Sequence, residues 1–364
     1  MVIVHTETVV FDEPLHLECG RDLHPFEIAY ARYGELNAAG DNAILVLHGL
    51  TTDQHAAGQS GPQRRPGWWD AVIGPGKAMD TDRWCIICPN ALGSYGGSSG
   101  PASSDPKTGR PYGMRFPIAT IADSVASQVH LADHLGIRRF HGIAGGCFGG
   151  FQVLEWMARH GDRVGRAVVI TATPRTSAHN LALWSVLRDA IRSDPNWKGG
   201  DYYDGPPPDA GLGLMAKFGA LFWMNRQTYE QKFGLQHLAG KVPAYGFEPE
   251  FEAEAFLENV GRNAAGRMDA NSLLYLTRAV DYFDMTRGHG SLRDVFANYR
   301  SPTLLVSYAK DWRYPAEEMA EIATVLEAVG APTHHMTLDS PGGHGSFLYD
   351  TAGLTPLLGD FLAT

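Results

Sequence analysis

Residues 145–150 (GGCFGG) constrain the fold of this 364-residue chain more than any other stretch. Residues 140–144 (FHGIA) have the composition of a short buried strand, and residues 151–159 (FQVLEWMAR) have the apolar spacing of a helix. A strand, a glycine-flanked turn and a helix in immediate succession are the context of a nucleophile elbow, whose central side chain projects from the top of a sheet. The central residue here is Cys147 instead of the usual serine.

The four glycines of this turn have a mechanical role. The nucleophile of an elbow has a strained backbone, and side chains at positions 145, 146, 149 and 150 would collide with the neighbouring strand and helix. The turn also puts Cys147 at the N-terminus of the helix, where unpaired N–H groups and the helix dipole favour a thiolate. A small buried cysteine in a glycine-rich turn is the alternative interpretation, and the turn taken alone would favour it.

Composition places the chain among ordinary globular proteins. Its 44% hydrophobic and 19% charged residues suffice for one large α/β core with a substantial insertion, or for two ordinary domains. The formal charge of -10 argues against a nucleic-acid partner, which would need a basic face. The first residues meet acidic side chains before any long apolar run, so we expect no signal peptide, no membrane span and a cytoplasmic location.

The four cysteines are too few for a disulfide framework in a chain of this length. Cys85 and Cys88 have the spacing of a redox motif or half a metal site. Because they lie in the strand-like run 84–88 with no second pair of ligands, we expect them to pack within a strand. The histidines show no metal-binding spacing either, and no metal site is predicted.

Strand and helix patterns alternate over most of the chain. Three strand signals at the start suggest an antiparallel beginning (8–11, 15–19 and 26–33). Buried apolar runs then predict further strands at 43–47, 84–88, 167–170, 302–307 and 335–338, with a helix at 121–135 before the elbow. This alternation predicts an α/β fold with a mostly parallel central sheet covered on both faces.

The alternation stops between residues 174 and 300. Helical patterns at 178–191 and 272–282 occur there together with several Trp and Met residues, which indicates an inserted helical lid over an apolar pocket. We therefore expect a core in two parts, 1–173 and 301–364, separated by the lid at 174–300. A further segment, 89–101, is long and rich in small residues, and such a stretch in a compact domain is usually functional or disordered.

Two residues beyond the elbow complete a candidate catalytic triad. Asp311 follows the strand predicted at 302–307, and His344 lies in a glycine-rich loop after the last predicted strand. Nucleophile, acid and base in that chain order match enzymes with such an elbow. His344 would take the thiol proton from Cys147 and later activate an attacking hydroxyl, while Asp311 would fix the imidazole tautomer. Asp339, at the end of the last strand, is the alternative acid.

The loop 48–52 (HGLTT) after the strand at 43–47 supplies a second expectation. In enzymes with a nucleophile elbow, one N–H from that loop and the N–H of the residue after the nucleophile form the oxyanion hole. Leu50 and Phe148 would be those two donors, through their backbone.

With these pieces in place, the chain resembles the homoserine O-acetyltransferase family of α/β-hydrolases over nearly its whole length. The resemblance rests on residues 48–58, 66–70, 74–83, 109–112 with 116–117, 154–156, 194–197, 199–203, 269–284 (DANSLLYLTRAVDYFD) and 340–348. It implies the α/β-hydrolase fold, an acyl-CoA co-substrate with no bound cofactor, a ping-pong route through an acyl-enzyme, and a homodimer built with the lid helices.

Several departures from the family pattern fall at sites that matter. The family has serine at the position of Cys147, Met at Phe148, and aspartate at Gly345. That aspartate, with an arginine and a tyrosine of the lid, holds the amino-acid acceptor, and the matching lid positions here are Lys217 and Met224. Losing a carboxylate at an ammonium site leaves a buried charge unpaired, at a cost of about 2–5 kcal/mol. This argues against homoserine as the acceptor.

The sequence thus predicts an acyl-CoA-dependent O-acyltransferase that acts through a thioester on Cys147 and a small hydroxylated acceptor. A cysteine hydrolase on the same scaffold, an esterase, lactonase or thioesterase, is the alternative. A non-catalytic binding protein that lost its serine is a third possibility, against which the intact Asp311 and His344 argue. Neither the acyl chain nor the acceptor follows from the sequence.

Overall fold

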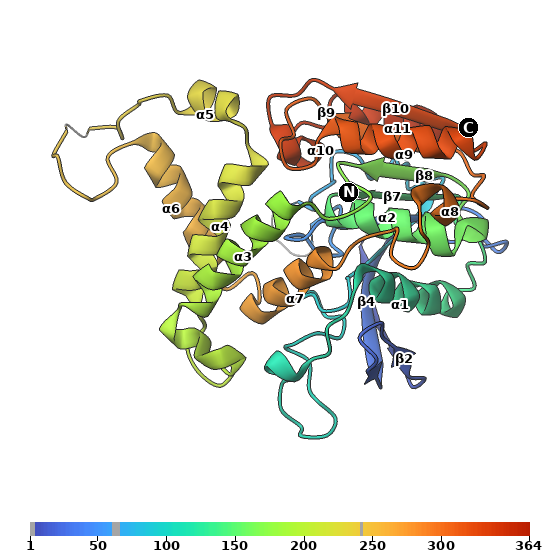
Figure 1. Cartoon of the computed structure of the whole chain (residues 1–364), viewed down its shortest axis with the longest axis horizontal. Helices are drawn as coiled ribbons and strands as arrows, with labels where there is room; N and C mark the ends of the chain where they lie inside the picture. Colours follow the sequence, from blue (N-terminus) through green and yellow to red (C-terminus); the bar gives the residue numbers. More distant parts are fainter. Residues whose placement is uncertain (1–3, 60–65, 241–242) are drawn as a thin grey trace.

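A computed structural model of the chain describes residues 4–59, 66–240 and 243–364. Its centre is an eight-stranded sheet in the order β1-β4-β6-β5-β7-β8-β9-β10 (Figure 1). The first two pairings, β1 with β4 and β4 with β6, are antiparallel, and the pairings from β6 to β10 are parallel. The strands are β1 (His5–Phe11), β4 (Phe26–Tyr33), β5 (Ala43–Leu47), β6 (Cys85–Pro89), β7 (Gly142–Gly146), β8 (Ala167–Ile170), β9 (Thr303–Tyr308) and β10 (Thr333–Leu338).

The five strands from β6 to β9 in the middle of this sheet are buried along their whole length. Continuous apolar runs have this property when helices cover both faces of a parallel sheet. The α/β-hydrolase architecture expected from the sequence is therefore confirmed. Cys85 and Cys88 lie within β6, as expected, and burial raises the pKa of Cys85 to about 11.

Four predicted strands differ from the structure by two residues or more. Strand β1 begins at His5 instead of residue 8, and β10 begins at Thr333 instead of residue 335. The run 15–19 contributes only β2 (Leu15–His16), which pairs with β3 (Asp22–Leu23) in a separate two-stranded sheet. The strand expected at 140–144 is β7, two residues further on. Its backbone pairing continues through Gly145 and Gly146, which have no side chains to give an apolar signal.

Helices of the core cover the sheet, and a helical extension lies to one side of it (Figure 1). The core helices are α1 (Ile121–His134), α2 (Phe148–Arg159), α8 (Leu292–Val295), α9 (Ala316–Ala328), α10 (Ser346–Tyr349) and α11 (Leu354–Ala363). The extension contains α3 (Ala178–Arg192), α4 (Asp209–Trp223), α5 (Arg226–Lys232) and α6 (Glu252–Ala264), and α7 (Ala270–Asp281) returns the chain to the core. Short 3-10 turns occur at η1 (Gly113–Arg115), η2 (Gly161–Arg163), η3 (Pro195–Gly200) and η4 (Gly343–Gly345).

All helices from α3 to α8 lie between β8 and β9, where the sequence predicts the lid. Local signals set their starts: Ser177 caps α3 and Asp269 caps α7, each by accepting a backbone N–H through its side chain. The Tyr275 hydroxyl donates to the Phe116 carbonyl (2.8 Å), which fastens α7 to the core. None of the helices in the described ranges has the length and apolarity needed to cross a bilayer.

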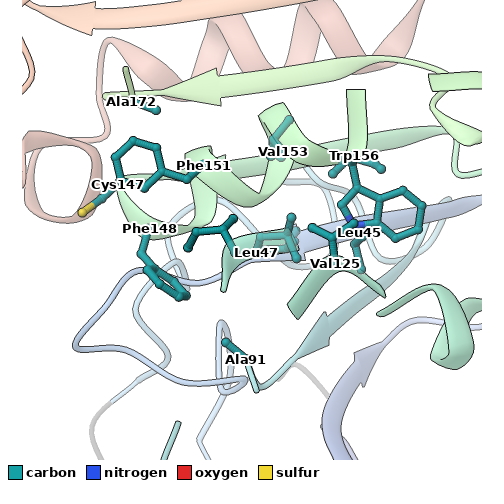
Figure 2. Packing of buried hydrophobic residues seen from close by; sticks show 14 of the residues in the cluster. Leu45, Leu47, Ala91, Val125, Cys147, Phe148, Phe151, Val153, Trp156 and Ala172 are labelled. Atoms are coloured by element: carbon teal, nitrogen blue, oxygen red, sulfur yellow. The ribbon is translucent and has the colours of Figure 1, made fainter. Parts of the chain in front are cut away.

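The apolar core beneath the elbow holds α2 against the sheet. Figure 2 shows Val153 and Trp156 of α2 packed over Leu45 and Leu47 of β5, and each of these side chains is at most 1% exposed. The Trp156 indole N–H donates to Gln128 of α1 (2.8 Å), so this buried polar group is satisfied. The position of the elbow is therefore fixed by packing on its own helix as well as by the sheet.

This close packing generates a testable prediction. A Cβ atom on Gly149 would overlap the carbonyl oxygen of Leu47, a backbone atom that cannot move aside. Gly149→Ala should lower the free energy of unfolding by about 3 kcal/mol or more. Gly359→Ala in α11 is the matched control, because its Cβ would make ordinary contacts (3.7 Å) with Ala78 and should stabilise the helix by about 0.5–1 kcal/mol.

Urea unfolding of both variants measures the difference. Equal stability of the Gly149→Ala and native proteins would contradict the close approach of α2 to β5.

Candidate active site

Cys147 occupies a strained turn between β7 and α2. Its φ of 56° and ψ of -119° lie outside the regions that non-glycine residues usually adopt. Its N–H donates to the Ile170 carbonyl at the end of β8 (3.0 Å), which ties the turn to the sheet. A Cβ on Gly146 would lie 2.7 Å from the Phe347 ring, so the expected need for glycine around the nucleophile is confirmed. The sulfur projects from the end of α2 in Figure 2.

Asp311 and His344 meet beside this sulfur. The His344 Nδ1–H donates to Asp311 Oδ2 at 2.8 Å, and the two side chains are 2% and 0% exposed. The second oxygen of Asp311 accepts the backbone N–H groups of Arg313 and Tyr314, each at 3.0 Å. His344 also hydrogen-bonds the thiol of Cys147. The structure therefore brings together the three residues that the sequence singles out for a triad.

The alternative acid, Asp339, lies elsewhere. Its side chain is 77% exposed and forms an ion pair with Lys310 at 3.0 Å. The carboxylate that contacts His344 is therefore that of Asp311, the residue favoured by chain order.

Electrostatics favour a thiolate and an imidazolium at this site. Burial alone would raise the pKa of Cys147, but the charge of His344 and its hydrogen bond hold the pKa below the usual thiol value, with a further contribution from Arg313. Burial alone would lower the pKa of His344, but Asp311 and then Cys147 raise it to about 9. The two shifts share one cause, because the charges of Cys147 and His344 stabilise each other in a site of low dielectric, while Asp311 contributes the larger part of the rise for His344.

The loop that carries Leu50 is held by a buried histidine. Burial lowers the pKa of His48, so its ring is neutral. The ring then donates from Nδ1 to the Gly49 carbonyl (2.7 Å) and accepts the Ala91 N–H at Nε2 (3.0 Å). This pattern fixes the backbone around Leu50, the predicted oxyanion donor, which is 6% exposed and lines the same cavity as Cys147.

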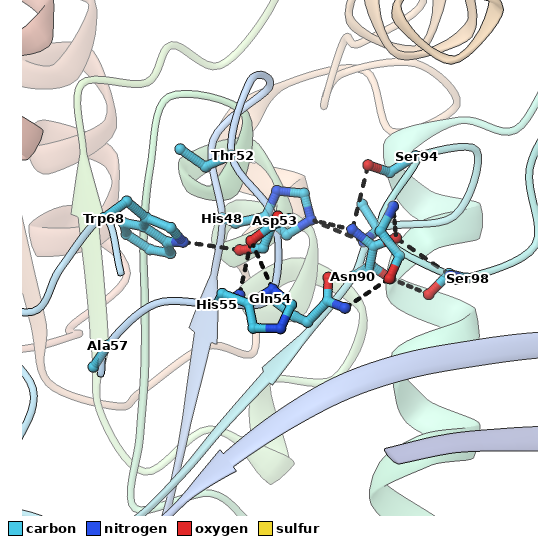
Figure 3. A network of polar contacts seen from close by, with 12 residues as sticks. His48, Thr52, Asp53, Gln54, His55, Ala57, Trp68, Asn90, Ser94 and Ser98 are labelled. Carbon is cyan, nitrogen blue, oxygen red and sulfur yellow. Dashed lines mark hydrogen bonds and ion pairs between the residues drawn. The ribbon is translucent and has the colours of Figure 1, made fainter. Parts of the chain in front are cut away.

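The segment 89–101 completes this support (Figure 3). Gln54 donates to the Gly96 carbonyl (2.6 Å), and the Asn90 side chain accepts the Gly96 N–H (3.0 Å). The Ser98 hydroxyl donates to the Asn90 carbonyl (2.7 Å). The segment 89–101 is therefore ordered, and its hydrogen bonds hold the loop that carries Leu50.

A cavity opens in front of the sulfur, under the lid. It encloses about 780 Å³, including space open to solvent. Cys147 and His344 lie on the core side, and Trp184 of α3 with Met215 of α4 lie on the lid side. Most of the lining is apolar, as the sequence predicts for a pocket under this lid. The basic side chains among its described lining residues are Arg313 and His344.

The structure places one of the three predicted acceptor-binding residues at the cavity and two outside it. Gly345 lines the cavity, but Lys217 and Met224 are not among the described residues that do. Lys217 instead forms an ion pair with Glu258 of α6. Among the described residues of α4 that line the cavity are Phe222 and Trp223, the latter next to Met224 in the chain.

Sequence reasoning missed Arg313 and the role of His48. Arg313 stands two positions after Asp311, and its charge was the available signal. His48 was placed in the correct loop, but only the structure shows that its ring holds the loop. No group of three or more His, Cys, Asp or Glu side chains suited to a metal ion occurs within the described ranges.

Comparisons with known proteins place this geometry in context. Residues 42–351 match the family model described as alpha/beta hydrolase fold. Homoserine O-acetyltransferase of Geotalea uraniireducens is 42% identical over 99% of this chain and 97% of its own length. Homoserine O-succinyltransferase of Acidithiobacillus ferrooxidans is 41% identical over 99% of this chain and 95% of its own length.

Two solved structures are similar to the chain over nearly its whole length. The chain superposes on homoserine O-acetyltransferase from Bacillus anthracis with a TM-score of 0.92, at 28% identity and over 100% and 99% of the two chains. It also superposes on esterase E22 with a TM-score of 0.90, at 26% identity and over 99% and 100% of the two chains.

Alkylation by iodoacetamide tests the charge state of Cys147. An ordinary thiol with a pKa of about 8.5 loses reactivity as the pH falls below that value. The lowered pKa of Cys147 keeps the thiolate populated further into the acid range, so its alkylation should persist there. Asp311→Asn removes the charge that stabilises the imidazolium, and the midpoint for Cys147 should move to higher pH.

Cys19 is exposed and provides an internal reference in the same sample. Peptide mapping at each pH separates the two cysteines. A midpoint for Cys147 that does not respond to Asp311→Asn would contradict the coupling.

Proposed function

This chain belongs to the homoserine O-acetyltransferase family of α/β-hydrolases, and on that basis we propose that it is an acyl-CoA-dependent O-acyltransferase with Cys147 as nucleophile. The observation that carries the proposal is the buried chain of contacts from Asp311 through His344 to Cys147, beside a cavity under the lid. Relatives named for acetyl transfer and for succinyl transfer have nearly equal sequence identity to this chain. Overall similarity therefore does not select the acyl group.

In the first half-reaction, the thiolate of Cys147 attacks the carbonyl carbon of an acyl-CoA thioester. Negative charge develops on the carbonyl oxygen, where the N–H groups of Leu50 and Phe148 are the proposed donors. The bond to the CoA sulfur then breaks, and the His344 imidazolium supplies the proton that leaves with CoA. One thioester replaces another, so this step is close to thermoneutral.

In the second half-reaction, a hydroxyl group of the acceptor attacks the thioester carbonyl carbon of the acyl-enzyme. The new ester bond forms as the bond from that carbon to the Cys147 sulfur breaks, and the sulfur leaves as the thiolate. The thiolate charge is absent from the acyl-enzyme, and that charge is one of the causes that raise the pKa of His344. The pKa of the imidazole therefore falls after acylation, and the neutral ring can take the proton of the acceptor hydroxyl. Asp311 holds Nδ1 and so keeps Nε2 free for this transfer.

The acceptor we propose is small and hydroxylated but need not be homoserine. No Asp or Glu occurs among the described residues that line the cavity, and Gly345 leaves no carboxylate to pair with an ammonium group. A Cβ on Gly345 would lie 3.1 Å from the Tyr349 ring and 3.3 Å from the Trp223 carbonyl oxygen, so little space surrounds this position. These features support an acceptor whose recognition does not depend on a buried ammonium.

Hydrolysis is the second candidate. The similarity to esterase E22 supports it, since water could replace the acceptor in the same acyl-enzyme. The apolar lining of the cavity favours transfer over hydrolysis, because it limits water near the thioester.

Intact-protein mass spectrometry distinguishes these functions. After mixing with acetyl-, propionyl- and succinyl-CoA, the native protein should gain the mass of an acyl group, and Cys147→Ala should gain none. Cys19→Ala is the matched control and should be acylated like the native protein, since Cys19 is exposed and outside the cavity. A chase with homoserine, serine or buffer alone then shows which acceptor removes the acyl group.

Faster release by an added alcohol than by buffer is the expected result. Release at the same rate in buffer alone would favour the hydrolase. Failure of every CoA ester to acylate Cys147 would contradict the proposed function.

A further inference from the structure

The loop that carries the catalytic histidine is held from two sides. This histidine loop, residues 341–345, follows β10, and two consecutive glycines, Gly342 and Gly343, precede His344. Glycine restricts the backbone less than other residues do, so contacts outside the loop are needed to fix its position. The core supplies one such contact at the start of the loop, where the Ser340 hydroxyl donates to Asp350 Oδ2 (2.7 Å).

The lid supplies the second contact, at the junction of α4 and α5. The Thr228 hydroxyl, in the first turn of α5, donates to the Pro341 carbonyl. Gly343 has a φ of 61°, and a Cβ there would lie 3.4 Å from the Asn225 backbone nitrogen and 3.5 Å from the Trp223 carbonyl oxygen. The backbone of the junction therefore lies directly against the histidine loop. In Figure 1 the end of α4 lies beside α10, which follows this loop.

This contact stands at the wall of the cavity and can open. Trp223 on the lid side and Gly345 on the core side both line the cavity. Every residue of α5 is at least partly exposed, and a helix this short has little stability of its own. A hydrogen bond between exposed groups adds only modest stability, so the junction can leave the loop and return without unfolding of the lid.

The need for this contact changes during the reaction. In the resting protein, His344 is attracted both to Asp311 and to the Cys147 thiolate. Acylation removes the thiolate charge, so the ring keeps its hydrogen bond to Asp311 (2.8 Å) and loses the attraction from the sulfur. The position of the histidine loop then determines how well Nε2 is aligned with the hydroxyl of the acceptor.

We propose that Thr228 is a positioning residue, which holds the histidine loop through the Pro341 carbonyl and so aligns His344 for the second half-reaction. Thr228 is not among the described residues that line the cavity, and it therefore acts through the loop. The inference rests on the acyl-enzyme of the proposed function, which transfer and hydrolysis share. The lid thus has a second role besides covering the cavity: the base is aligned while the α4–α5 junction is docked on the loop.

The test separates the two half-reactions by following acyl-Cys147 with quenched-flow intact mass. The acyl donor is p-nitrophenyl acetate, which needs no recognition of CoA, and release is measured in buffer and with an added alcohol. In Thr228→Val, release of the acyl group should slow about 3- to 10-fold, the size expected for one lost hydrogen bond, while acylation changes by less than about 2-fold. The KM for the alcohol should stay unchanged, because no contact to the acceptor is lost.

Thr324→Val is the matched control. Thr324 of α9 is exposed and also donates its hydroxyl to a backbone carbonyl, that of Ala320 (2.9 Å). The control thus loses the same kind of hydrogen bond away from the histidine loop, and both of its half-reactions should keep their native rates. Thr228→Ser retains a hydroxyl donor and should restore most of the native rate of release.

Release at the native rate in Thr228→Val would contradict the inference. Equal slowing of both half-reactions, not relieved by Thr228→Ser, would make the contact merely structural and would also contradict it. A raised KM for the alcohol with an unchanged maximal rate would assign Thr228 to acceptor binding instead. CoA esters that fail to acylate the native protein, where p-nitrophenyl acetate succeeds, would contradict the proposed function alone. Failure of both kinds of donor to acylate Cys147 would contradict the two proposals together.

Discussion

The attraction between the Cys147 sulfur and the His344 imidazole is the interaction on which the rest of the structure depends. Burial opposes charge on both groups, yet each stabilises the charge of the other, and Asp311 completes the balance. Such mutual stabilisation in a dry site requires accurate placement, because the energy of a charge pair changes steeply with distance at low dielectric. The fold supplies that accuracy through backbone contacts: the elbow is tied to β8 by the Cys147 N–H, and Asp311 is held by two backbone N–H groups.

The lid and the supporting loops form the surroundings of Cys147 and His344. His48 and the ordered 89–101 loop fix the backbone near Leu50, so the proposed oxyanion donors need not reorganise as charge develops. Helices α3 and α4 enclose the sulfur in a mostly apolar cavity, where Arg313 is the conspicuous exception. The proposed thioester on Cys147 would therefore lie in a mostly apolar site, where access of water to the acyl group is limited.

The sequence predicted much of this because the relevant signals are local. Apolar runs predicted the bounds of β5 and β8 to the residue. The glycines around Cys147 indicated the close approach of α2 to β5 that the structure shows between Gly149 and Leu47. Chain order selected Asp311 over Asp339, and the ion pair of Asp339 with Lys310 agrees. Side-chain direction within the lid was not predictable, since α4 is apolar on several faces; Lys217 therefore turned out to pair with Glu258. The burial of Arg313 depends on Trp184 and Asn180, more than 120 positions away in the chain, and no local pattern encodes it.

Titration of His344 by NMR tests the central claim, the charge coupling of His344 and Cys147, most directly. In the native protein the ring should titrate with a pKa near 9, well above the ordinary value of 6.5. In Cys147→Ala the thiolate is gone while Asp311 remains, so the pKa should fall, although the hydrogen bond to Asp311 persists. A native pKa near the ordinary value, or an identical pKa in the two proteins, would contradict a thiolate–imidazolium pair at this site.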